Sequence, residues 1–168
     1  IVKELKENNM NENNLEKIIN NIVGDAIVKE VMSLKLAVKL IETVEEKAAE
    51  MGLAVVVAVS DASGRPVAVH CMDGAYHGSF DVAVNKTYTS TAFQMSTAKL
   101  SRLCQPGQDL YGLQFSNNGK VMILGGGEPL MVGRTMIGAL GVSGGSAQED
   151  SDLAAYGASA LKEVIKCL

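Results

Sequence analysis

The stretch Leu53-Ala-Val-Val-Val-Ala-Val-Ser60 decides how this chain folds, because its unbroken apolar run is typical of a central strand covered on both faces. It is followed by Asp61-Ala-Ser-Gly-Arg-Pro66, whose residue types favour a turn. The next segment, Val67-Ala-Val-His-Cys-Met72, again has the composition of a strand. Two such strands joined by a turn predict a β-hairpin.

Helical patterns lie on both sides of the hairpin. Ser33 is predicted to cap a helix from Leu34 to Met51, and Gly52 can end it in the left-handed conformation. Ser79 is predicted to cap a second helix that runs toward Phe93. Its expected core side is made of Ala83, Val84, Thr87, Tyr88 and Thr91.

The last third of the chain is rich in glycine and poor in charge, which indicates strands and turns. Gly138 and Gly141 fall inside one expected strand and indicate a bulge or a close approach by another backbone or a ligand. The expected elements are a short helix over 96–103, strands over 120–124 and 135–142, a turn over 125–129, a short apolar run over 130–132, and a final helix after the capping box Ser146-x-x-Glu149.

This order of elements predicts an α+β domain, with an antiparallel sheet of about five strands flanked by helices. We place the domain at residues 33–168. Residues 1–32 are predicted to be a polar linker, Lys6 to Asn14, followed by an amphipathic helix. The apolar residues of that helix recur at helical spacing and are Leu15, Ile18, Ile19, Ile22, Val23, Ala26 and Ile27.

The composition excludes several classes of protein. The chain has 168 residues, 47% of them hydrophobic, with a net charge of −4. Without a basic surface it has no means of holding polyanions, so we expect no nucleic-acid binding. Its longest apolar stretch, Leu53 to Val59, is far below the ~20 residues that cross a bilayer, so we expect no membrane insertion.

The three cysteines, Cys71, Cys104 and Cys167, are an odd number without a C-x-x-C spacing. This pattern argues against a disulfide framework and against a zinc ribbon. We therefore expect reduced thiols and a cytoplasmic location.

Four ordered segments together resemble one family: Asp61 to Ala75, Ala83-Val-Asn-Lys86, Gly126-Gly-Glu-Pro129 and Ile137 to Gly145. The chain is similar here to the GlcG, HbpS and PduO C-terminal domain family, also described as haem-degrading or DUF336. The resemblance covers about residues 33–168. It implies a profilin-like fold that assembles into dimers and larger homo-oligomers.

The resemblance also implies a function. Members are associated with glycolate, propanediol or glycerol utilisation, and some bind haem or a corrinoid such as cobalamin. We therefore expect a small-ligand-binding accessory protein with haem or cobalamin as the cofactor. Two alternatives remain open. The first is an enzyme acting on a small hydroxy acid or aldehyde, with Lys86 and Asp73 as charge partners and His77 as acid or base. The second is a non-catalytic oligomeric scaffold.

The site is expected where the loop after the hairpin, Lys86 and the turn over 125–129 converge. Asp73 could accept hydrogen bonds from a ligand or tie its loop as an Asx-turn. The Lys86 ammonium could meet a carboxylate or phosphate, or extend to solvent. The candidate ligand-binding residues are Met72, Asp73, Gly74, Ala75, His77, Lys86, Gly126, Gly127 and Pro129.

His70 and His77 are the two histidines of the chain and the candidate metal ligands if haem binds. His70 could instead have a structural role on its strand, and we expect His77, in a loop, to contribute more. Some haem-binding relatives carry an axial histidine on the first domain helix, but residues 34–51 contain none. Lys86 or Arg65 would be the partners of the propionates.

Residues 15–31 resemble the encapsulation peptides that dock cargo to bacterial microcompartment shells, which implies a shell protein as partner and a location inside a microcompartment. The alternative is that this segment packs on the domain or in an oligomer interface. Self-association is also expected from the segment Thr135 to Val142, which carries no charge.

Overall fold

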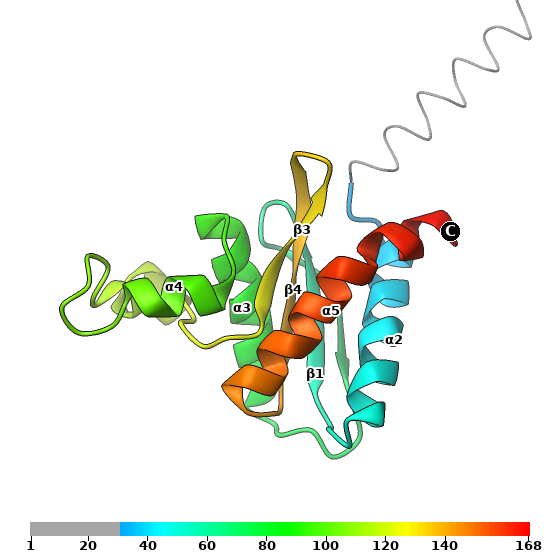
Figure 1. The fold of residues 1–168 in the computed structure, drawn as a ribbon, viewed down its shortest axis with the longest axis horizontal. Helices are drawn as coiled ribbons and strands as arrows, with labels where there is room; N and C mark the ends of the chain where they lie inside the picture. Colours follow the sequence, from blue (N-terminus) through cyan, green and yellow to red (C-terminus); the bar gives the residue numbers. More distant parts are fainter. Residues whose placement is uncertain (1–30) are drawn as a thin grey trace, which may run out of the picture.

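The segment predicted as a central strand is central, because β1 pairs with a neighbouring strand on each side. The computed structural model describes residues 31–168, and within them the sheet has four antiparallel strands in the order β2-β1-β4-β3 (Figure 1). The predicted hairpin is confirmed by the antiparallel pairing of β1 with β2, which sets Val57 opposite His70. In chain order the elements are α2 (Leu34–Glu50), β1 (Val56–Asp61), β2 (Pro66–Cys71), α3 (Ser79–Phe93), α4 (Thr97–Leu103), the 3-10 turns η1 (Leu113–Phe115) and η2 (Asn117–Gly119), β3 (Gly127–Val132), β4 (Thr135–Ser143) and α5 (Ala147–Lys166).

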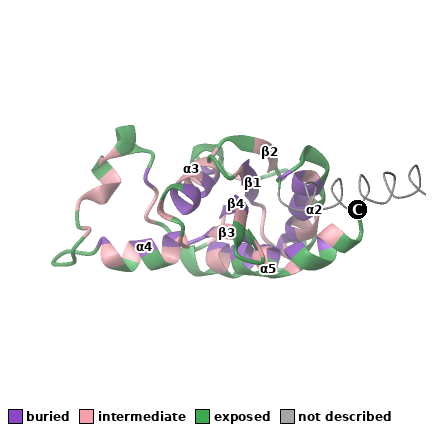
Figure 2. Cartoon of the chain, turned by 90° about the horizontal axis from the view of Figure 1, so that it is seen from above, coloured by how far each residue is buried: buried purple, intermediate pink, exposed green. Residues whose placement is uncertain are grey.

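Helices cover both faces of this sheet, as Figures 1 and 2 show. α3 packs on one face, while α2 and α5 pack against each other on the opposite face. The side chains of β1 alternate accordingly. Val57 and Val59 lie in the core under α2 and α5, whereas Val56 and Ala58 pack with Ala83 of α3. The predicted α+β architecture with flanking helices is therefore confirmed.

Two of the predicted helix caps are present. The Ser33 hydroxyl accepts a hydrogen bond from the backbone N–H of Leu36 at 3.2 Å, at the start of α2. The capping box at the start of α5 is complete, since Ser146 and Glu149 each accept a hydrogen bond from the other's backbone N–H. These local signals therefore fix where both helices of one layer begin.

The third predicted cap is wrong. α3 begins after Gly78, whose backbone already has helical angles, and no side chain caps it. Ser79 lies inside the helix and is buried, with its backbone N–H bonded to the carbonyl of Tyr76. The buried face of α3 also differs from the prediction. It includes Lys86 and Ser90, whereas Tyr88 and Val84 are only half-buried.

The strand predicted over 120–124 is also wrong, and the described sheet has four strands rather than five. Val121 is buried in a small cluster with Leu100 and Cys104, beside α4, instead of pairing with the sheet. The fourth strand is β3, which joins the predicted turn and the predicted apolar run into one element. Because β3 is an edge strand, it tolerates Pro129, which cannot donate a backbone hydrogen bond.

Gly141 determines how closely α3 approaches β4. A Cβ atom at this position would collide with the backbone carbonyl oxygen of Ala83, which cannot move without displacing the helix. The close backbone approach predicted for this glycine is therefore present.

We expect Gly141→Ala to lower the free energy of unfolding by about 1–3 kcal/mol, because the added methyl group overpacks this contact. Urea denaturation followed by circular dichroism measures the effect. Gly78→Ala is the matched control, since nothing lies within 4 Å of a Cβ at that position, and it should stay within about 0.5 kcal/mol of wild type. An equal loss in both variants would contradict the packing argument.

Candidate functional site

Lys86 is the most deeply buried of the predicted site residues. It lies on α3 with 1% of its surface exposed, so the expectation that its head extends to solvent is wrong. Its Nζ donates hydrogen bonds to a carboxylate oxygen of Asp150 at 2.7 Å and to the carbonyl oxygen of Val142 at 2.6 Å. Burial lowers the pKa of the Lys86 ammonium, and the Asp150 carboxylate opposes that shift. The positive charge of Lys86 is therefore compensated within the fold.

Asp150 completes this pair from the first turn of α5. It is 4% exposed, and its second carboxylate oxygen accepts a hydrogen bond from the backbone N–H of Gly145 at 2.9 Å. Sequence reasoning missed this residue, although a signal was present. Asp150 precedes Leu153 and Gly157 on the buried stripe of α5, and a carboxylate in such a position requires a partner.

Gly126 and Gly127 lie beside the ion pair, as the predicted convergence requires. Gly126 has a φ of +109°, and a Cβ there would lie 2.8 Å from Lys86 Nζ and 2.7 Å from the carbonyl oxygen of Val142. The backbone N–H of Gly127 donates to the Thr97 hydroxyl at 2.9 Å. Gly126 therefore leaves the space in which Lys86 reaches Asp150.

The loop over 72–77 does not reach this cluster. It follows β2, whereas the glycine turn precedes β3, and these strands are the two opposite edges of the sheet. Three strand spacings separate them, about 14 Å. The loop and the glycine turn lie at the same end of the sheet but at its opposite edges. They therefore do not form the single pocket that was expected.

Within this loop the predicted residues have different environments. Met72 packs against the main core, and Ala75 packs against the cluster beneath α3. Gly74 has a φ of +87°, which makes the turn that glycine favours. Asp73 is exposed, and its side chain makes no hydrogen bond within residues 31–168, so the Asx-turn alternative is not formed. Its carboxylate is therefore available to a ligand.

His77 is the exposed imidazole of the loop. Its side chain has no hydrogen-bond partner in the described part of the chain. Tyr76 beside it is 74% exposed, and Phe80, one helical turn further on, is 45% exposed. The backbone N–H of Phe80 donates to the carbonyl oxygen of His77 at 3.4 Å, so both residues belong to the turn that leads into α3. An exposed imidazole therefore shares a short segment with two exposed aromatic rings.

His70 has the opposite character. It is half-buried on β2, and its Nδ1 lies 3.2 Å from a carboxylate oxygen of Glu45 on α2. This contact joins the hairpin to the helix layer, which supports the structural interpretation of His70. Among residues 31–168, no group of three or more metal-ligating side chains is present.

Neither cation predicted to pair with haem propionates lies beside His77. Lys86 is nine residues further along, about 13 Å of helix rise, and is paired with Asp150. Arg65 lies in the turn before β2, at the end of that strand opposite His77. The remaining candidate, Pro129, pairs with Ala139 inside the sheet.

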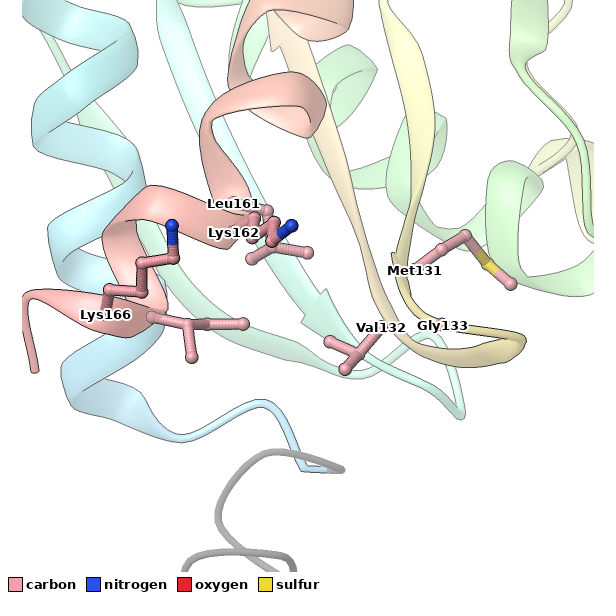
Figure 3. Close-up of a pocket in the computed structure, with 7 residues that line it drawn as sticks. Met131, Val132, Gly133, Leu161, Lys162 and Lys166 are labelled. Carbon is pink, nitrogen blue, oxygen red and sulfur yellow. The ribbon is translucent and has the colours of Figure 1, made fainter.

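A cavity of about 400 Å³ is lined by none of these residues (Figure 3). It is formed between the tip of the β3–β4 hairpin and the last turns of α5. Its lining residues are Met131, Val132, Gly133, Leu161, Lys162, Ile165 and Lys166. No helix in the described range has both the length and the apolar character needed to span a membrane.

Comparison with known proteins places this geometry among relatives. Residues 32–159 match the family described as haem degrading protein HbpS-like. An uncharacterized 15.0 kDa protein in the dhaT-dhaS intergenic region of Citrobacter freundii is 39% identical over 123 residues, which cover 73% of this chain and 87% of that protein. The corrinoid adenosyltransferase PduO of Salmonella typhimurium is 39% identical over 109 residues, which cover 65% of this chain but 32% of PduO.

Two solved structures are similar over most of the chain. Klebsiella pneumoniae ORFY superposes with a TM-score of 0.76 at 36% identity, covering 78% of this chain and 90% of that one. The PduOC:heme complex superposes with a TM-score of 0.74 at 35% identity, covering 77% and 94% of the two chains.

We expect Lys86→Met to lower the free energy of unfolding by about 3–5 kcal/mol, because it leaves the Asp150 carboxylate buried without a counter-charge. Adding Asp150→Asn should recover at least about 1 kcal/mol, since the amide oxygen keeps the Gly145 hydrogen bond and no charge stays buried. Chemical denaturation measures both. The exposed Lys99→Met is the control and should change stability by less than about 0.5 kcal/mol. If the double variant loses as much stability as Lys86→Met or more, the two groups are not coupled.

Proposed function

Because this chain belongs to the HbpS-like family of haem degrading proteins, we propose that it is an accessory protein that binds haem or a corrinoid. The similarity to the PduOC:heme complex and to corrinoid adenosyltransferase PduO supports both cofactors as candidates. We further propose that the protein serves diol, glycerol or glycolate utilisation. The association of this family with these pathways, together with the similarity to PduO, supports such a role.

The main observation behind this proposal is the environment of the His77 imidazole. Neutral imidazole is a common axial donor to haem iron, and the His77 ring is exposed and without a hydrogen bond among the described residues. The exposed rings of Tyr76 and Phe80 offer apolar surface to a planar macrocycle. These residues fit the group, and when bound it would supply a metal centre that the side chains of this chain do not.

His70 is the weaker donor in this proposal. Its Nδ1 is directed at Glu45, and moving the ring to a metal would break the contact between β2 and α2. The single-domain match to PduO spans 32% of that protein, so its adenosyltransferase activity is not transferred to this chain.

The enzyme alternative receives less support from the geometry. It requires Lys86 and Asp73 as charge partners around one substrate, but Lys86 is buried and paired with Asp150. Asp73 is exposed on the loop at the opposite edge of the sheet. Lys86 and Asp73 therefore do not indicate a common position at which both could bind one substrate.

Self-association and shell docking complete the proposal. The two edge strands, β2 and β3, leave backbone groups that a second copy could pair with, and light scattering at micromolar concentration measures this. Residues 15–30 of the proposed shell-docking segment, 15–31, lie outside the described residues. Fusion of residues 1–32 to a fluorescent protein in a compartment-forming cell tests it, since a diffuse signal would remove the targeting role.

We expect haem added to the purified protein to give a shifted Soret band that saturates at one equivalent per subunit. His77→Ala should weaken this band more than His70→Ala, because the exposed imidazole is free to ligate iron while His70 is held by Glu45. Absorbance titration measures both, and unchanged thermal unfolding of His77→Ala serves as the folding control.

Equal spectra for wild type and both single variants would mean that neither histidine ligates iron. The same titration with cobalamin separates the two cofactors. A response to neither cofactor would overturn the proposed function.

A further inference from the structure

The cavity at the tip of the β3–β4 hairpin has an apolar lining with a basic rim (Figure 3). Met131 and Val132 contribute apolar surface from the hairpin, and Leu161 and Ile165 contribute it from α5. Lys162 and Lys166 also line it from α5, and Lys166 pairs with Glu163 on the exposed surface. An apolar surface with cations around it fits an amphipathic segment better than a polar small molecule.

Further apolar side chains are exposed at the same end of the domain. Val31 is 55% exposed, Leu34 is 61% exposed and Leu168 is 45% exposed. Leu34 and Leu168 line a second cavity, together with Val38, Lys35, Lys39 and Glu42. Exposed apolar surface of this kind, gathered beside two cavities, indicates a docking surface.

The chain enters the domain beside this surface. Met32 is 4% exposed and belongs to the same hydrophobic core as Leu161, with Val132 and Ile165 packed against it. Figure 1 shows the start of α2 and the tip of the β3–β4 hairpin at the same end of the domain. Whatever precedes Val31 therefore starts at the end of the domain that holds the cavity.

The sequence before Val31 has the apolar and charged residues expected of a segment that binds this surface. Its apolar residues recur at helical spacing from Leu15 to Ile27, with polar residues between them. Ile27 is four residues from Val31, a reach of at most about 14 Å. The stretch from Leu15 to Ile27 carries Glu16 and Asp25 against one lysine, Lys17, so its net charge is opposite in sign to that of the basic rim.

We propose that residues 15–27 of the same chain dock on this cavity through their apolar stripe. The short tether makes the contact intramolecular, with an effective concentration on the order of millimolar. The stripe then covers Met131 and the apolar floor beside it. A partner that recognises the same stripe has to compete with the domain for it.

Disulfide trapping in the full-length chain tests this docking. The background carries Cys71→Ser and Cys167→Ser, which remove the exposed thiols and leave buried Cys104. Ile22→Cys is then combined with Met131→Cys at the cavity. The matched control combines Ile22→Cys with Leu124→Cys, because Leu124 is 51% and Met131 46% exposed but Leu124 lies beyond the opposite end of β3.

We expect the cavity pair to form an intramolecular disulfide at least about fivefold faster than the control pair under dilute oxidant, as an effective concentration in the millimolar range requires. Non-reducing electrophoresis and mass spectrometry measure it. Adding Ile18→Asp and Ile19→Asp, which remove the apolar stripe but leave the domain intact, should reduce the rate to that of the control.

Two outcomes would overturn the proposal. A covalent dimer from the cavity pair would show that a second copy supplies the segment, and equal rates for the two pairs would show that the cavity does not receive it. Unchanged trapping after the two aspartate substitutions would also count against recognition of the stripe. Haem is absent from the assay, so its result is independent of the proposed function.

Discussion

The buried ion pair between Lys86 and Asp150 is the interaction on which the arrangement of the layers depends. Lys86 comes from the helix on one face of the sheet and Asp150 from a helix on the other, so the pair closes around the end of β4. Removing two charges from water is expensive, and the pair is tolerable because each member has a second hydrogen bond. Its geometry therefore fixes where α3 and α5 lie relative to the sheet.

The position of this ion pair also explains two glycines that have no side chain to take part in binding or catalysis. Gly126 has no side chain because a Cβ would occupy the position of the ammonium and the carbonyl that it bonds. Gly141 has none because α3 must come close enough for Lys86 to reach past β4. Packing is thus sufficient to explain Gly126, a candidate ligand-binding residue, and Gly141.

The parts of the fold that the sequence predicted rest on local signals. The hairpin follows from the apolar run ending at Ser60 and the turn after it, and α5 follows from its capping box. β3 was missed because Gly127 and Pro129 obscure a strand that only an edge position permits. The separation of the 72–77 loop from the glycine turn depends on strand order, which no short motif encodes. The pairing of Asp150 with Lys86 could not be predicted for the same reason, since the two residues are 64 positions apart.

The two surfaces that remain open to binding lie at opposite ends of the sheet. His77 follows the end of β2 where β1 begins and β4 ends, whereas the cavity lies at the hairpin that joins β3 to β4. A six-residue strand such as β3 spans about 20 Å, so a ligand at His77 cannot contact the cavity directly. Any influence of one on the other would have to pass through the packed core between α3, the sheet and α5. Cofactor binding and docking of residues 15–27 are therefore separable properties of this chain, each alterable by surface substitutions that leave Lys86 and Asp150 in place.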